Sequence, residues 1–115
     1  MSRTRQQEQA QYAWNCIDEA KNGNINFSEY TQILQGSGAM ILSCGLGQTV
    51  AFYFSQSGSH YKLILQQWAK MLGIESKEQL IESLMSDSSS YRYKTNQILS
   101  LLDWMKRFSK GVGQQ

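Results

Sequence analysis

The side chains that most often carry catalysis or hold metal ions are scarce in this chain. His60 is the only histidine, and the two cysteines, Cys16 and Cys44, lie far apart in the sequence. None of them belongs to a CxxC, HExxH, GxSxG or Walker pattern. A general base or a metal site needs several such groups close together. We therefore expect no catalytic residue, no metal ion and no cofactor. His60 is expected at the surface or at a helix start, and both cysteines as small buried hydrophobic residues.

A glycine-containing run offers the only other recognisable chemistry. Gly45 and Gly47, in the run GLGQT at 45–49, open an expected helix. The N-terminus of a helix can hold a phosphate group on its free N–H groups. No lysine follows the run, however, and the flanking residues are apolar. The pattern therefore favours a tight structural turn between two buried helices.

Positive charge gathers near the C-terminus, although the net charge of the chain is only +2. On a helix over about 91–110, four cations fall within about 100° of arc, and they are Arg92, Lys106, Arg107 and Lys110. Asp103 shares this arc and is placed to pair with Arg107 or Lys106. On another expected helix, Lys62 and Lys70 also point away from the apolar stripe. The six cations are candidates for sequence-independent contacts with a nucleic-acid backbone.

The aromatic residues allow two interpretations, because exposed rings can stack on bases. At helical spacing such rings are more often part of the core, and we expect core positions for Trp68 and Phe108. For Tyr12, Tyr91 and Tyr93 both interpretations stay open.

Helical periodicity dominates the chain and predicts an all-α fold, a compact bundle of about five to seven helices forming a single domain over 1–115. Proline is absent and hydrophobic residues make up 41% of the chain, as suits packed helices. The segment 46–54 could also form a strand, but a helix is favoured because nothing else in the chain could pair with it. We expect the second helix to begin near Ser28 and to kink or break at 36–38, where two glycines flank Ser37.

No segment predicts a membrane span or a signal peptide. The most apolar stretch, 39–54, is too short and is interrupted by glycines and polar residues. The first residues lack the apolar centre of a secretory signal. We therefore expect a cytoplasmic protein that does not contact a membrane.

Three segments carry a resemblance to a known family. They are GLGQTVAFY at 45–53, YRYKT at 91–95 and LDWMKRF at 102–108, while WAKML at 68–72 fits less specifically. In order and spacing they resemble the small-subunit family of the type III-B CRISPR (Cmr) RNA-guided effector complex. The resemblance covers roughly residues 10–110.

The resemblance implies an all-helical bundle without a catalytic centre. Small subunits of this family stack in several copies along the backbone subunits, beside the large subunit, and line the path of the guide RNA and target RNA. Cleavage belongs to other subunits of these antiviral complexes. Alone, the protein is expected to be monomeric.

One departure from the family pattern bears on the glycine turn. The family usually has a basic residue shortly before the glycine and an asparagine directly before it, where this chain has Leu42 and Cys44. The departure supports a packing role for Gly45. A second hypothesis of another class also stays open: a small helical protein-interaction or regulatory module that binds no nucleic acid. It would use the acidic segment 74–87 or an exposed apolar patch.

Overall fold

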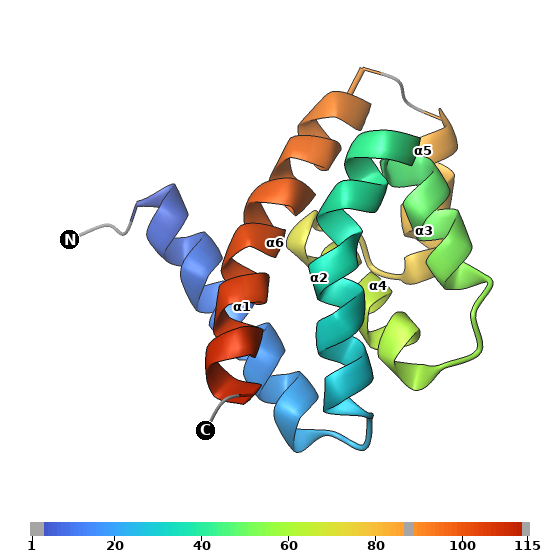
Figure 1. Ribbon diagram of the computed structural model, residues 1–115. Helices are drawn as coiled ribbons and strands as arrows, with labels where there is room; N and C mark the ends of the chain where they lie inside the picture. The colour runs from blue at the N-terminus through green and yellow to red at the C-terminus, as the bar shows by residue number, and fades with distance from the viewer. Residues whose placement is uncertain (1–3, 87–88, 114–115) are drawn as a thin grey trace.

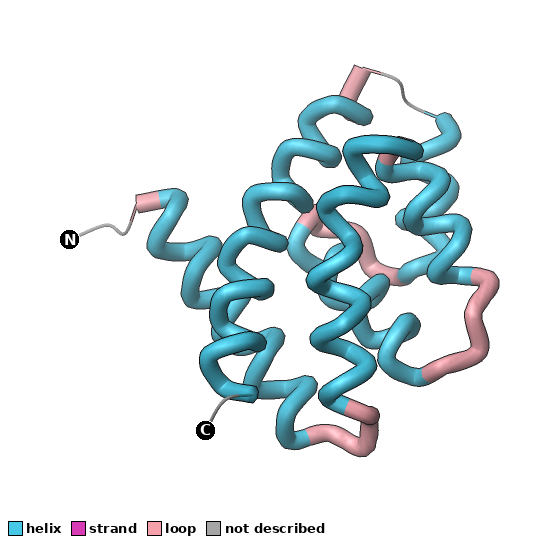
Figure 2. Tube along the Cα trace, viewed as in Figure 1, coloured by secondary structure: helices cyan, strands magenta, loops and turns pink. Residues whose placement is uncertain are grey.

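Six helices make up nearly all of the computed structural model, which describes residues 4–86 and 89–113. Within these residues there is no strand (Figure 2), so the expected all-α bundle is confirmed. The helices are α1 (Arg5–Asn22), α2 (Phe27–Cys44), α3 (Leu46–Phe54), α4 (Ser59–Met71), α5 (Lys77–Ser86) and α6 (Tyr91–Gly113).

Side-chain caps mark the starts of α1, α2 and α5. Thr4 caps α1, and its hydroxyl accepts from the Gln7 N–H while the Gln7 side chain accepts from the Thr4 N–H. The hydroxyl of Ser76 accepts from the Gln79 N–H at the start of α5. The expected start of α2 at Ser28 is wrong. Asn26 is the cap, because its side-chain oxygen accepts from the N–H of Glu29.

A break at 36–38 is not formed, because α2 runs unbroken past Gly36 and Gly38. Ser37, between them, is fully buried. Its hydroxyl bonds to the Ile33 carbonyl at 2.6 Å and to the Tyr53 hydroxyl at 2.7 Å. The bond to Tyr53 ties α2 to α3, and α2 also packs on α6.

The core is built from the inner faces of all six helices. α1 and α2 each pack against both α4 and α6, while α3 and α5 close the bundle next to α2 and α4 (Figure 1). α4 and α6 are not in extensive contact with each other and so lie diagonally across the core. Trp68 of α4 is fully buried, as predicted, 5.9 Å from the ring of Tyr53. The apolar stripe of α6 is buried at Ile98, Leu102 and Met105.

A buried glutamine joins three helices at the centre of the bundle. Gln67 of α4 donates from its amide nitrogen to the Cys16 carbonyl and to the Glu19 carboxylate of α1, each at 3.0 Å. Its amide oxygen accepts from the Tyr30 hydroxyl of α2 at 2.6 Å, and its backbone carbonyl accepts from the Tyr12 hydroxyl. Because each of these groups is satisfied, burying the amide fixes how α1, α2 and α4 meet.

No helix in the described part of the chain is long and apolar enough to cross a membrane. Cys16 is buried, as expected, but the same prediction for Cys44 is wrong. Cys44 is the last residue of α2 and its side chain is exposed, because the apolar stripe of that helix ends at Ile41.

Candidate nucleic-acid interface

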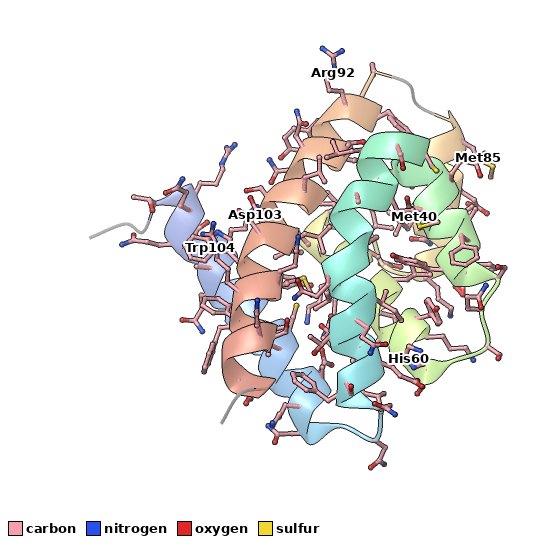
Figure 3. All side chains as sticks on the ribbon, viewed as in Figure 1. Met40, His60, Met85, Arg92, Asp103 and Trp104 are labelled. Atoms are coloured by element: carbon pink, nitrogen blue, oxygen red, sulfur yellow. The ribbon has the colours of Figure 1, made fainter. Side chains whose placement is uncertain are left out.

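The outer face of α6 carries the four predicted cations, which we call the basic ridge: Arg92, Lys106, Arg107 and Lys110. The helix is continuous from Tyr91 to Gly113, so the ridge spans about 27 Å along one side. Arg92, Arg107 and Lys110 are exposed, and Lys106 is half-buried on the side next to α2. Figure 3 shows Arg92 projecting away from the bundle at the start of α6.

The cations of the ridge have no acidic partner within the described residues. The ion pairs found there are His60 with Glu29 at 3.5 Å and Lys77 with Glu78 at 3.0 Å. The pairing of Asp103 with Arg107 or Lys106, which the helical spacing allowed, is therefore not formed. Asp103 lowers the positive potential of the ridge but leaves its donors available to an anion.

Contacts with three other helices hold the ridge in place. The phenol oxygen of Tyr91 accepts from the Gly47 N–H at 2.7 Å, which fastens the start of α6 to the N-terminus of α3. In the middle of α6, the Ser100 hydroxyl donates to the Gln9 side chain of α1 at 2.6 Å. Further along, the Gln35 side chain of α2 donates to the Lys106 carbonyl at 3.4 Å. The ridge is thus a fixed surface and not a single free helix.

The glycine turn before α3 joins α2 to α3 through a single residue, Gly45. Gly45 has φ +90°, a region that L side chains rarely adopt, and its N–H donates to the Ile41 carbonyl at 2.8 Å. The Gly47 N–H, which a phosphate would need, already donates to Tyr91. The α3 N-terminus therefore serves helix packing.

Lys62 and Lys70 do not join the basic ridge. Both are exposed on α4, diagonally opposite α6. Lys70 lines an open groove of about 460 Å³ between α1 and α4, together with Tyr12, Asn15 and Glu19. The chain therefore has two separate basic areas where the sequence allowed one continuous surface.

Two of the reactive side chains, His60 and Cys16, lie against neighbouring helices, whereas Cys44 is exposed. His60 lies in the first turn of α4, where it is half-buried next to Glu29 of α2. Burial raises the pKa of the Cys16 thiol to about 12, so the thiol is protonated near neutral pH and is a poor nucleophile. Among residues 4–86 and 89–113, no three His, Cys, Asp or Glu side chains gather as a metal site would require.

The comparisons with known proteins agree with this architecture. A family model described as a CRISPR-associated protein, Cas_Cmr5, matches residues 5–112. The chain belongs to the Cmr5 family. A curated relative from Thermus thermophilus, "CRISPR system Cmr subunit Cmr5", is 28% identical over 111 residues, which cover 96% of each protein. The crystal structure of a CRISPR-associated Cmr5 family protein from the same organism superposes with a TM-score of 0.86 at 28% identity. The superposition covers 96% of this chain and 97% of the chain in the crystal structure.

Membership in the Cmr5 family confirms the resemblance seen in the sequence, and the structure shows why two of its segments belong together. The glycine run contributes Gly47 and the YRYKT segment contributes Tyr91, and these two residues form the bond between α3 and α6. Neither segment alone predicts that contact, because the two residues lie far apart in sequence.

An aromatic cluster that the sequence did not predict lies beside the ridge. Phe108, expected in the core, is only half-buried and contacts Trp14 of α1 and Trp104 of α6. Trp14 retains 47% of its surface exposed. Tyr93 is 57% exposed, whereas Tyr12 and Tyr91 are half-buried and make hydrogen bonds. No periodicity argument distinguishes a core ring from a boundary ring, because both lie next to the apolar stripe.

Proposed function

We propose that this protein is the non-catalytic small subunit of a cytoplasmic type III-B Cmr ribonucleoprotein complex in antiviral defence. In this role, copies of the subunit stack along the backbone subunits and contact the large subunit. The basic ridge faces the guide RNA and target RNA and contacts their phosphates without reading base sequence.

The observation that carries the proposal is the unpaired basic ridge on a member of the Cmr5 family. Three exposed cations and one half-buried cation lie along one helix face with no carboxylate within 4.0 Å among the described residues. Intrahelical ion pairs would compete with a polyanion, and here they are absent from the face that would bind it. Contacts of this kind are individually weak and salt-sensitive. Copies held side by side on one complex would make many such contacts with the same RNA, and the high effective concentration would raise the total affinity.

Lys62 and Lys70 remain candidates for a separate contact with RNA or with a neighbouring subunit. Because they lie across the bundle from the ridge, one straight RNA strand is not expected to touch both areas of the same copy. This separation makes the α4 pair a matched control for the ridge.

The test compares complexes reconstituted with Arg92→Ala/Arg107→Ala against complexes with Lys62→Ala/Lys70→Ala. Each variant removes two exposed cations, so the two differ in position and not in net charge. The ridge variant should weaken target-RNA binding more, and the difference should shrink as salt rises. The full variant, Arg92, Lys106, Arg107 and Lys110 all changed to alanine, should show the largest loss while keeping its fold. Equal binding by all complexes at every salt concentration would contradict the proposal.

The alternative function, a protein-interaction module without nucleic-acid binding, makes a different prediction for the same experiment. Such a module would use the acidic segment 74–87 or an exposed apolar patch, so the ridge variant would behave like the unmodified protein. Failure of the ridge variant to enter the complex would instead assign the ridge to a protein partner. Recovery of the complex by affinity purification, followed by a test for bound guide RNA, separates the two functions.

A further inference from the structure

Three aromatic rings form a continuous cluster where α1 meets α6. The ring of Phe108 is stacked with Trp104 at 5.8 Å between centroids and an interplanar angle of 28°. Trp14 meets the same phenylalanine edge-on at 5.4 Å and 89°. Trp14 is 47% exposed, and the other two rings are half-buried. We call Trp14, Trp104 and Phe108 the ring cluster.

The ring cluster adjoins the basic ridge. Trp104 lies one helical turn before Arg107, and Phe108 directly follows it, so the rings line the edge of the ridge next to α1. Figure 3 shows Trp104 on the side of α6 that is next to α1. Tyr93, 57% exposed, lies on the same line of the helix about 16 Å before Trp104. Aromatic surface and cations thus run in parallel along one helix.

This combination matches the chemistry of a single nucleic-acid strand. Proteins that bind single strands pair a basic track for the phosphates with rings on which bases stack. An exposed tryptophan is equally typical of a protein interface. Here the neighbouring cations lack carboxylate partners among the described residues, so a polyanion whose flat bases can stack suits the surface better than a protein segment does.

We infer that the ring cluster is a stacking platform for unpaired bases of an RNA strand whose phosphates lie on the basic ridge. This inference rests on the proposed function and adds a second kind of contact to it. Every base offers an aromatic face, so the platform accepts any RNA sequence. Trp14, the most exposed of the three rings, supplies the accessible stacking surface.

The test uses complexes reconstituted with Trp14→Ala or Trp14→Phe and two probes, an oligouridylate and an abasic ribose-phosphate strand of the same length. The alanine variant should bind the oligouridylate about fivefold or more weakly than the phenylalanine variant does. Phenylalanine keeps a ring and should retain most of the affinity. The abasic strand lacks bases, so both variants should bind it alike.

Three outcomes would overturn the inference. The two variants could bind the oligouridylate equally, or the alanine variant could lose the same affinity for the abasic strand. Alternatively, the alanine variant could fail to enter the complex, which would make the cluster a protein interface. Failure of the proposed function is recognised separately, by the Arg92→Ala/Arg107→Ala variant binding both probes like the unmodified complex. Unfolding midpoints of the free variants show whether a loss comes from the fold.

Discussion

The Gly47 N–H donates to the hydroxyl oxygen of Tyr91 at 2.7 Å, although the two residues belong to helices that lie far apart in the sequence. The phenol satisfies one of the free donors at the α3 N-terminus and so acts as a cap supplied by another helix. The contact also leaves little room for side chains on either glycine. A Cβ atom would lie 3.1 Å from the Tyr91 oxygen at Gly45 and 3.2 Å from it at Gly47.

Tyr91→Phe should destabilise the protein by about 1–2 kcal/mol, because it leaves the partly buried Gly47 N–H without its acceptor. Tyr93→Phe is the matched control. It removes a tyrosine hydroxyl from an exposed ring on the same helix and should change the free energy of unfolding little. Urea unfolding followed by circular dichroism measures both. If the two variants unfold at the same urea concentration, the cap does not contribute to stability.

Gly45→Val should destabilise the fold by about 1–3 kcal/mol, because the residue has φ +90° and a β-branched side chain there is strained. The effect should appear as a lower melting temperature of the free protein, followed by poorer assembly. A variant that melts normally but no longer assembles would instead assign this turn a direct role in binding.

Gly38→Ala should stabilise the protein by about 0.5–1 kcal/mol, because α2 is helical there and an added methyl group meets no atom within 4 Å. Gly47→Ala makes the same chemical change in α3 but brings the new methyl group close to Tyr91. It should be neutral or destabilising. Thermal unfolding of the two variants compares them directly, and a loss of stability from Gly38→Ala would restore the idea of a special backbone conformation at 36–38.

Stability should fall at alkaline pH. Burial raises the pKa of Tyr30 and of Tyr12 above the ordinary tyrosine value of 10.0, and that of Cys16 to about 12. Above the ordinary values the unfolded chain loses these protons while the folded chain keeps them, so the free energy of unfolding decreases as pH rises. The contribution of these three groups to stability should be constant below about pH 8 and should decline from about pH 9 upward.

Tyr30→Phe serves to check that the buried tyrosine contributes to this decline. The variant should be less stable at neutral pH, because the Gln67 amide oxygen loses its donor. Its further loss of stability between about pH 9 and 12 should be smaller than in the unmodified protein, since one of the titrating groups is gone. If the free energy of unfolding falls equally with pH in the two proteins, the Tyr30 proton is not linked to folding.

The sequence by itself determined the helices, the glycine turn and the basic face of the last helix. These features depend on residues close together in the chain. The apolar stripe of α6 and the spacing of Arg92 and Lys110 follow from helical geometry, and the tight turn follows from the glycines of the run at 45–49. The expected start of α2 lies too late in the chain, because Ser28 and Asn26 are both good caps and the side chain of Asn26 is the one that caps the helix.

Only the tertiary structure decided which faces of the helices meet. Gln67 reads as a polar surface residue, yet it is buried because α1 and α2 bring Cys16 and Tyr30 within reach of its amide. Phe108 is expected in the core, yet it is only half-buried where it contacts Trp14 of α1. Helical periodicity fixes the direction of a side chain on its own helix, whereas burial depends on how far the neighbouring helix extends over it. That extent is set by the packing of the whole bundle.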